Sequence, residues 1–142
     1  MRVLQIGADR SKRGILYPHS PAVERQRAYG EHFDALDIIG FSLRSDGRSS
    51  FAVSDKVFIY PTRSYSKLFY GIDAIAILRV LPKPDVLSVQ DPFEAGLLGL
   101  LLSKVLRVPL HVQVHTDAFD EGYRRHSLSN RIRSEIARIV LA

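Results

Sequence analysis

The sequence predicts an α/β fold with a mostly parallel sheet, and three observations carry this prediction. Short apolar runs of strand length alternate along the chain with longer stretches of helical periodicity. Glycine and proline residues separate many of these runs, as they do where strands and helices end. The 142 residues, 46% of them hydrophobic, are enough for one domain with its own core. We therefore expect a single domain over residues 1–142, with helices on both faces of the sheet.

The first half of the chain is expected to begin with a buried strand. Ser20 and Pro21 mark the start of the first helix, because serine caps helices well and proline suits the first helical position. The expected strands cover residues 2–6, 35–41 and 56–60, one helix starts at residue 21, and another covers 64–81. The residues expected to face the core are Val23, Tyr29 and Phe33 in the first helix and Leu68, Ile72, Ile75 and Ala76 in the second. Residues 44–55 are expected to form a surface loop.

The second half continues the alternation. Strands are expected at residues 85–90 and 110–115, helices at 92–106 and 129–141, and a charged loop at 116–126. The last helix is expected to turn Ile132, Ile136, Ile139 and Val140 toward the core. This order predicts a Rossmann-like domain, in which a further strand normally follows such a helix. We therefore expect the chain to be part of a longer protein, with the last strand or strands of the sheet missing.

Composition and charge exclude several classes of function. The sequence has no cysteine, which excludes a disulfide framework, a thiolate nucleophile and a cysteine-ligated metal. Its most apolar stretch, at 93–102, is about half of the ~20 residues that a membrane span needs, so we expect a soluble, globular protein. The net charge of +5 favours anionic partners. The sequence contains no recognised nucleic-acid-binding motif, and nucleic acid is not expected as a partner.

Residues 85–99 are the most informative segment, because a strand there is expected to pass through a short turn directly into a helix. Asp91 is placed to cap that helix, and Glu94 lies near the positive end of its dipole. Gly96 and Gly99 leave a helix face that can approach the sheet closely. Open α/β sheets bind ligands at the edge where this strand ends. Asp91 and Glu94 therefore have two possible roles. They bind a ligand, or they only stabilise the start of a helix that packs on the sheet.

Residues 110–117 form the second informative segment. Strand alternation puts His111, Gln113 and His115 on one face. His115 ends the expected strand, so its imidazole should lie at the same sheet edge, with Asp117 just beyond it. There it can exchange a hydrogen bond or a proton with a substrate hydroxyl. The alternative is a structural histidine bonded to nearby backbone. His111 and His115 are too far apart on a strand to share a metal ion, so no metal site is expected.

Two basic segments are compatible with binding of anions. The loop after the first strand carries Arg10, Lys12 and Arg13, but it lacks the glycine spacing of a dinucleotide-binding motif or a P-loop. The last helix and its approach carry five arginines against the single acid Glu135, namely Arg124, Arg125, Arg131, Arg133 and Arg138. The loop suits a phosphate or similar anion, and the helix suits anionic lipid headgroups. Solvated basic surface is the alternative interpretation of both.

Four segments together resemble the N-terminal half of a family 4 retaining glycosyltransferase, an enzyme of GT-B architecture. The two more specific ones are Gln-Asp-Pro-Phe-Glu at 90–94, followed by Gly96, and Val-His-Thr-Asp at 114–117. The expected helices that contain residues 23–26 and 130–133 match more loosely. The resemblance implies two Rossmann-like domains that face each other across a cleft. In such enzymes the N-terminal domain mainly binds the acceptor, and the C-terminal domain binds the nucleotide-sugar donor, without a metal ion or other cofactor.

For this chain the resemblance implies a cytoplasmic domain that binds a free or lipid-linked glycan as acceptor. Peripheral contact of the domain with the inner face of the membrane is compatible with this role. His115 matches the histidine that lies beside the transferred sugar, and it is implied to be catalytic. Asp91, Glu94 and Asp117 are implied to bind substrate in the same cleft. The paired-glutamate motif of the family's C-terminal domain is absent here, and the usual Gly-Gly after the first strand is Gly7-Ala8. We therefore expect no meaningful sugar transfer from this chain alone.

A second hypothesis, from another class, is a stand-alone α/β module that binds a partner and catalyses nothing. An exposed sheet edge would suit such a partner, and an uncovered apolar edge also makes self-association of the chain an expectation. A coding sequence that continues into a second α/β domain would favour the transferase, whereas a stable monomer of this length would favour the module.

Overall fold

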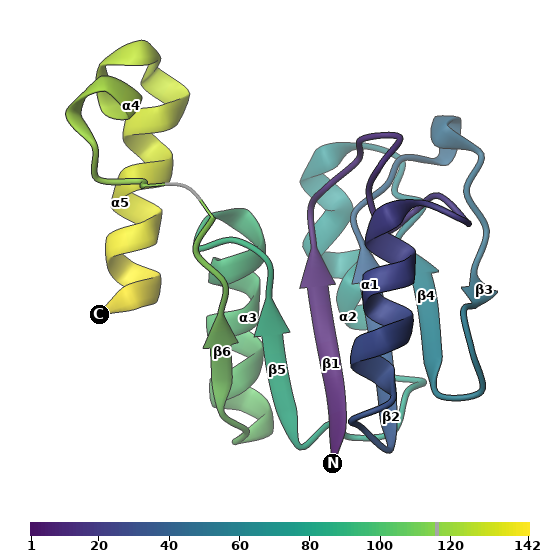
Figure 1. Ribbon diagram of the computed structural model, residues 1–142. Coiled ribbons are helices and arrows are strands. Elements are labelled where there is room, and N and C mark those ends of the chain that lie inside the picture. Colours follow the sequence, from purple (N-terminus) through teal and green to yellow (C-terminus); the bar gives the residue numbers. More distant parts are fainter. Residues whose placement is uncertain (116) are drawn as a thin grey trace.

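The computed structural model describes residues 1–115 and 117–142 and contains a six-stranded sheet (Figure 1). The strands lie in the order β3-β4-β2-β1-β5-β6. Neighbouring strands pair in parallel, apart from the antiparallel pair of β3 and β4. Their bounds are Arg2–Gly7 for β1, Ala35–Gly40 for β2, Phe51–Ala52 for β3, Val57–Pro61 for β4, Val86–Val89 for β5 and Leu110–Val112 for β6. The predicted mostly parallel, Rossmann-like sheet is confirmed.

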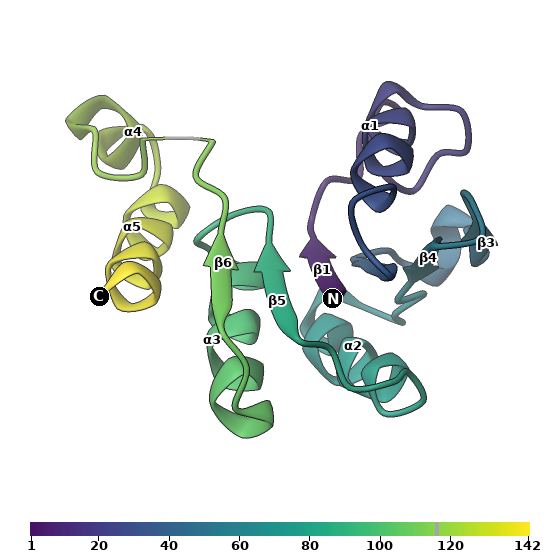
Figure 2. The ribbon, with the colours of Figure 1, turned by 60° about the horizontal axis from the view of Figure 1, so that its bottom comes forward.

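Helices cover both faces of this sheet, as predicted. One face carries α1, the other carries α2 and α3, and α4 and α5 lie beyond β6 (Figures 1 and 2). Their bounds are Pro21–Gly30 for α1, Tyr70–Leu78 for α2, Glu94–Leu106 for α3, Glu121–His126 for α4 and Leu128–Leu141 for α5, with short 3-10 helices at Arg44–Asp46 and Lys67–Phe69. Within the described residues, none of these helices has the length and apolar character needed to cross a bilayer.

A separate apolar core lies on each face of the sheet. Under α1, the buried residues Leu36, Ile38 and Ile59 pack with Val23. The core under α2 and α3 contains Leu4, Ile6, Ile39, Leu87 and Val89 from the strands and Ala74, Leu78 and Ala95 from the helices. Strand β2 contributes to both cores, and all six of its residues are buried. That is the pattern of a central parallel strand with both faces covered.

Strands β5 and β6 differ from β2, because only one of their faces is covered. Leu87 and Val89 belong to the core beneath α3. Ser88 and His111 lie on the opposite face, where their side chains meet (Oγ to Nδ1, 3.1 Å). That face carries α1, but α1 lies over β2 beside β4 and does not reach across β5 and β6 (Figures 1 and 2). The alternation of apolar and polar residues in these two strands therefore matches a half-covered sheet.

Helix α1 begins where the sequence predicts but turns a different side toward the sheet. The Ser20 hydroxyl accepts a hydrogen bond from the backbone N–H of Val23 (3.1 Å), which confirms Ser20 as the N-cap. Gln26 and Gly30 are buried, whereas Tyr29 is 52% exposed, so its expected place in the core is wrong. Gly30 explains the difference. A methyl group there would overlap Val57, so the helix approaches β4 through its glycine side.

The second predicted helix is shorter than expected and rotated. The N–H of Ser64 donates to the carbonyl of Ser42 (2.8 Å), so this segment stays extended beside the sheet and α2 starts only at Tyr70. Leu68 and Ile72, both expected in the core, are 90% and 63% exposed. The buried residues of α2 are Ala74 and Leu78, which lie on the same side of the helix.

Local hydrogen bonds explain three further differences. Within the predicted loop at 44–55, Phe51 and Ala52 pair with β4 as the edge strand β3. The carboxylate of Asp91 accepts from the N–H of Phe93 (2.8 Å), which forms a turn ahead of α3. As a result α3 starts at Glu94, and Asp91 is not its N-cap. Strand β6 ends at Val112, earlier than predicted.

The C-terminal region also departs from its prediction. Helix α4 occupies part of the predicted charged loop, and its N-cap Asp120 accepts from the N–H of Tyr123 (2.9 Å). In α5, Ile132 and Ile139 were expected to be buried but are 55% and 60% exposed. This helix packs against α3, where Val140 lies against Gly96. Its buried side is therefore a narrow stripe of Ser134, Ala137 and Val140.

Candidate functional site

The carboxyl ends of β1 and β5 lie side by side near the middle of the sheet. From β1 the chain continues to α1 on one face, and from β5 it continues to α3 on the other (Figure 2). Two hollows of about 310 and 470 Å³ open at this edge and share Ala8, Glu94 and Arg133 in their linings. We call the two hollows together the cleft. Open α/β sheets bind their ligands at this kind of switch point.

The cleft brings together most of the residues that the sequence singled out. Asp91, Glu94 and His115 line the larger hollow, although they come from two separate motifs. Asp117 is not among the lining residues of either hollow. Its carboxylate accepts from the N–H of Phe119 (3.0 Å) and so shapes the turn before α4. Thr116, between the two halves of the second motif, lies outside the described residues.

Asp91 is a partly buried carboxyl group at the end of β5. Burial raises the pKa of Asp91 above its ordinary value, and the neighbouring Glu94 carboxylate raises it further. The N–H of Phe93 and the Arg133 guanidinium act against this rise. The burial effect prevails, so Asp91 holds its proton to a higher pH than an exposed aspartate does.

His115 ends a chain of hydrogen bonds that runs along the uncovered face of β5 and β6. Its Nε2 lies 3.3 Å from Gln113 Oε1, and Gln113 Nε2 donates to Ser88 Oγ (3.2 Å). Ser88 in turn meets His111 Nδ1 (3.1 Å). These bonds connect the three side chains that were predicted to share a face, although Gln113 and His115 lie beyond the end of β6 at Val112. Because a carbonyl oxygen only accepts, Nε2 of His115 is the donor in this contact, and in the neutral imidazole Nδ1 is then left to accept a hydrogen bond from a hydroxyl.

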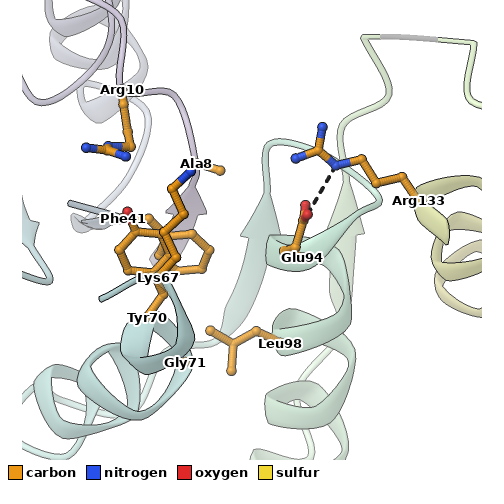
Figure 3. Close-up of a pocket in the computed structure, with 9 residues that line it drawn as sticks. All are labelled: Ala8, Arg10, Phe41, Lys67, Tyr70, Gly71, Glu94, Leu98 and Arg133. Atoms are coloured by element: carbon orange, nitrogen blue, oxygen red, sulfur yellow. Dashed lines mark hydrogen bonds and ion pairs between the residues drawn. The ribbon is translucent and has the colours of Figure 1, made fainter. Parts of the chain in front are cut away.

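One wall of the cleft is built by Arg133 of α5. Its Nε donates to Glu94 (3.1 Å; Figure 3). Its guanidinium lies 5.7 Å from the centre of the Phe93 ring. Phe93 in turn stacks on Tyr123 of α4 (6.1 Å between ring centres). The sequence placed Arg133 only in a basic helix. The structure pairs three further arginines of that region with acids, in Arg124–Glu135, Arg125–Glu121 and Arg138–Glu135. Much of the positive charge expected there is therefore offset.

The opposite wall carries two more cations and a pair of stacked rings. Arg10 donates to both carboxylate oxygens of Asp46 (2.9 Å each). Phe41 and Tyr70 stack with their ring centres 5.0 Å apart, and Lys67 extends beside them (Figure 3). Lys67 makes no ion pair with any of the described residues. Sequence reasoning raised Arg10 as an anion ligand but missed Lys67 and Tyr70, because it assigned both to one long helix.

The chemistry of the cleft is that of a polar, mixed-charge binding site. In residues 1–115 and 117–142, no group of three or more histidine, aspartate or glutamate side chains is arranged to hold a metal ion. The cleft offers instead hydrogen-bonding groups for a sugar, such as His115 and Asp91, and positive charge for an anion, such as Lys67.

Comparisons with known proteins add no assignment. No protein-family model matches the sequence, and a search of curated proteins found no match. The resemblance to family 4 glycosyltransferases therefore rests on the motifs at 90–96 and 114–117.

Proposed function

We propose that this chain is the acceptor-side domain of a retaining glycosyltransferase similar to those of family 4. The observation that supports the proposal best is the meeting of His115, Asp91 and Glu94 in one hollow at the carboxyl edge of a Rossmann-like sheet. These residues belong to the two motifs that carry the family resemblance, which lie on separate segments of the chain. In this proposal the acceptor occupies the cleft, and the nucleotide-sugar reaches it from a second domain.

His115 is the proposed catalytic residue. Its imidazole is exposed to the hollow, and Gln113 holds it through Nε2, so Nδ1 can accept a hydrogen bond from a hydroxyl of the reacting sugar. Because the pKa of Asp91 is raised, its carboxyl group stays protonated to a higher pH than that of an ordinary aspartate, and the protonated form can donate a hydrogen bond to a sugar oxygen. Glu94 holds Arg133 in the wall and so positions a cation beside the bound acceptor.

The cations of the cleft favour a lipid-linked acceptor over a free neutral glycan. Lys67 and Arg133 lie on opposite walls of the smaller hollow, and Arg10 lies near Lys67 (Figure 3). A lipid-linked glycan carries phosphate at its linkage, and these side chains would bind it. A cytoplasmic location, with the lipid held at the membrane surface, is part of the same proposal.

The test measures binding of glucose 1-phosphate, a soluble sugar phosphate, to the 142-residue chain by amide NMR. We expect shifts at residues around the cleft and weaker binding in His115→Ala. His32→Ala, which changes an exposed histidine outside the cleft, is the matched control. Binding that His115→Ala leaves unchanged would remove His115 from the site. Shifts that avoid the cleft altogether would overturn the proposal.

Activity separates the proposal from a non-catalytic binding module. We expect no transfer from the 142-residue chain alone and sugar transfer from a natural protein that joins this chain to a donor-binding domain. Binding of the sugar phosphate without transfer in any such protein would favour the module instead.

A further inference from the structure

A groove lies on the face of the sheet beside α1, and it shares none of its lining residues with the cleft. Its volume is about 280 Å³. Strands β1, β5 and β6 form its floor, and α1 forms its wall. Its described lining includes no aspartate, glutamate, lysine or arginine. Met1 also lines the groove, but its N-terminal ammonium pairs with Asp34, so a ligand that enters the groove is expected to be uncharged.

Two glutamines in the groove have unpaired amide atoms. Gln5 Nε2 and Gln26 Oε1 make no hydrogen bond with the described residues, although the side chains are only 4% and 5% exposed. Burial of such atoms costs free energy unless something binds them, and a purely structural contact between α1 and β1 would be better made by leucine. Both unpaired atoms have almost no exposed surface, so a ligand in the groove would satisfy them only after the amide groups turn toward it.

The unpaired atoms also specify what the ligand must do. Gln5 Nε2 is a donor and Gln26 Oε1 is an acceptor, so the ligand must accept one hydrogen bond and donate another. A hydroxyl group is the smallest neutral organic group that does both. Ser88, His111 and Gln113 add further neutral hydrogen-bonding groups along the floor of the groove.

The wall of the groove adds an apolar, aromatic surface. Tyr29 and Phe33 both line it, and Tyr29 is half exposed although it lies on a helix that packs on the sheet. The lining thus combines aromatic rings with uncharged amide, hydroxyl and imidazole groups. A pyranose ring matches this combination, because it has an apolar C–H face and a rim of hydroxyl groups.

We propose that the groove binds one neutral saccharide unit, at a site separate from the cleft. With both amide groups turned toward the groove, one sugar hydroxyl accepts from Gln5 Nε2 and donates to Gln26 Oε1, and the C–H face of the ring packs against Tyr29 or Phe33. The groove volume of about 280 Å³ falls just below the range of about 300–1,000 Å³ for ligand pockets, which suits a single ring. The inference rests on the residues of the groove and does not depend on the role proposed for the cleft.

The test is an amide NMR titration of the 142-residue chain with four neutral sugars at millimolar concentration, namely methyl glucoside, methyl mannoside, methyl galactoside and N-acetylglucosamine. We expect at least one of them to shift the signals of Ser88 and Gln113. Gln5→Leu and Gln26→Leu should each weaken that binding about tenfold or more. Both variants should unfold at the same or a higher temperature, because each removes a buried unpaired amide. Gln90→Leu, which changes a glutamine that lines the cleft, should bind the sugar normally.

A second pair of variants keeps the test decisive if a glutamine variant does not fold. Tyr29→Ala removes a half-exposed ring from the groove and should also weaken sugar binding. Its matched control is Tyr65→Ala, since Tyr65 is 85% exposed and does not line the groove. The inference is overturned if none of the four sugars shifts any signal, or if the shifts are confined to the cleft. It is also overturned if Tyr29→Ala binds the sugar as tightly as the unaltered chain does. The two proposals can also fail separately. If the chain does not bind glucose 1-phosphate in the cleft but binds a neutral sugar, and Gln5→Leu abolishes the sugar binding, the groove proposal is supported and only the proposed function is rejected.

Discussion

The cleft and the groove belong to one sheet but differ in chemistry. The cleft lies at the ends of strands and combines the paired Glu94 and Arg133 with the unpaired cation Lys67. The groove lies on the face of strands and presents buried amides and aromatic rings without a charged side chain in its described lining. Loops that follow strand ends are solvated and can carry charge, whereas a strand face must pack against something. The end of such a sheet therefore suits charged ligands, and its uncovered face suits neutral ones.

The largest expected effect separates the two regions by activity. In a natural protein that joins this chain to a donor-binding domain, His115→Ala should cost about 2–4 kcal/mol of transition-state stabilisation, because the proposed contact to the reacting hydroxyl is lost. The measurement is kcat/KM for sugar transfer, with His32→Ala as the control. Sugar binding in the groove should be unaffected. A transfer rate equal to that of the unaltered protein would show that His115 has no catalytic role.

The second effect concerns the wall that supports the cleft. A methyl group on Gly99 of α3 would overlap the buried side chain of Val89, so Gly99→Ala should lower the free energy of unfolding by about 1–3 kcal/mol. Urea denaturation measures this loss. Gly71→Ala in α2 is the matched control, since its nearest neighbour is Leu98 at 3.9 Å and alanine favours the helix. Equal stability of the two variants would mean that α3 does not rely on a close approach to β5.

A smaller effect is expected when one positive charge of the cleft is removed, and it should be confined to ligand binding in the cleft. Lys67→Gln should weaken binding of glucose 1-phosphate by about 0.2–1 kcal/mol, as expected for one exposed ionic contact. The effect should shrink as salt is added, because salt screens exposed charges. Neutral sugars in the groove should bind as before. Lys83→Gln, at an exposed lysine outside the cleft, is the control, and an equal loss in both variants would argue against a specific role for Lys67.

The smallest effect is a difference in pH dependence. The folded chain raises the pKa of Asp91 above its ordinary value of 3.8, so the protonated form favours the fold. This contribution is complete below that value and is lost as the pH rises through the folded pKa. The variant Asp91→Asn retains a side-chain oxygen that can accept the hydrogen bond from the N–H of Phe93, but it has no negative charge at any pH. It should therefore gain stability relative to the unaltered chain between acidic and neutral pH, as measured by urea denaturation. A difference that does not change with pH would mean that burial of Asp91 has little effect.

The sequence was a good guide to where strands and helices lie and a poor guide to which side of each helix is buried. Apolar runs located β1, β2 and β5 closely, because strands that are buried on one or both faces are mostly apolar. Leu68 and Ile72, for example, were assigned to the buried side of the second helix but are exposed. Periodicity shows that a helix has an apolar side, but the closest approach to the sheet is made by small residues such as Ala74 and Gly30.

The candidate site was predictable to the extent that it depends on strand ends. Asp91 and His115 follow neighbouring parallel strands, so their meeting at one edge follows from the order of the elements. Asp117 lies too far beyond β6, which ends at Val112, and its carboxylate serves a local turn. The position of Arg133 in the cleft could not be predicted from strand ends. Its place in the cleft depends on how α5 packs against α3, which no local pattern encodes.

The distance along the chain between Glu94 and its partner has a consequence for synthesis. Arg133 lies 39 positions after Glu94, on the helix that ends the described chain. A ribosome releases all six strands before it releases that helix, so the nascent domain can assemble its sheet while one side of the cleft does not yet exist. Within the described chain, the cleft at the strand ends is therefore completed only when α5 has emerged and docked.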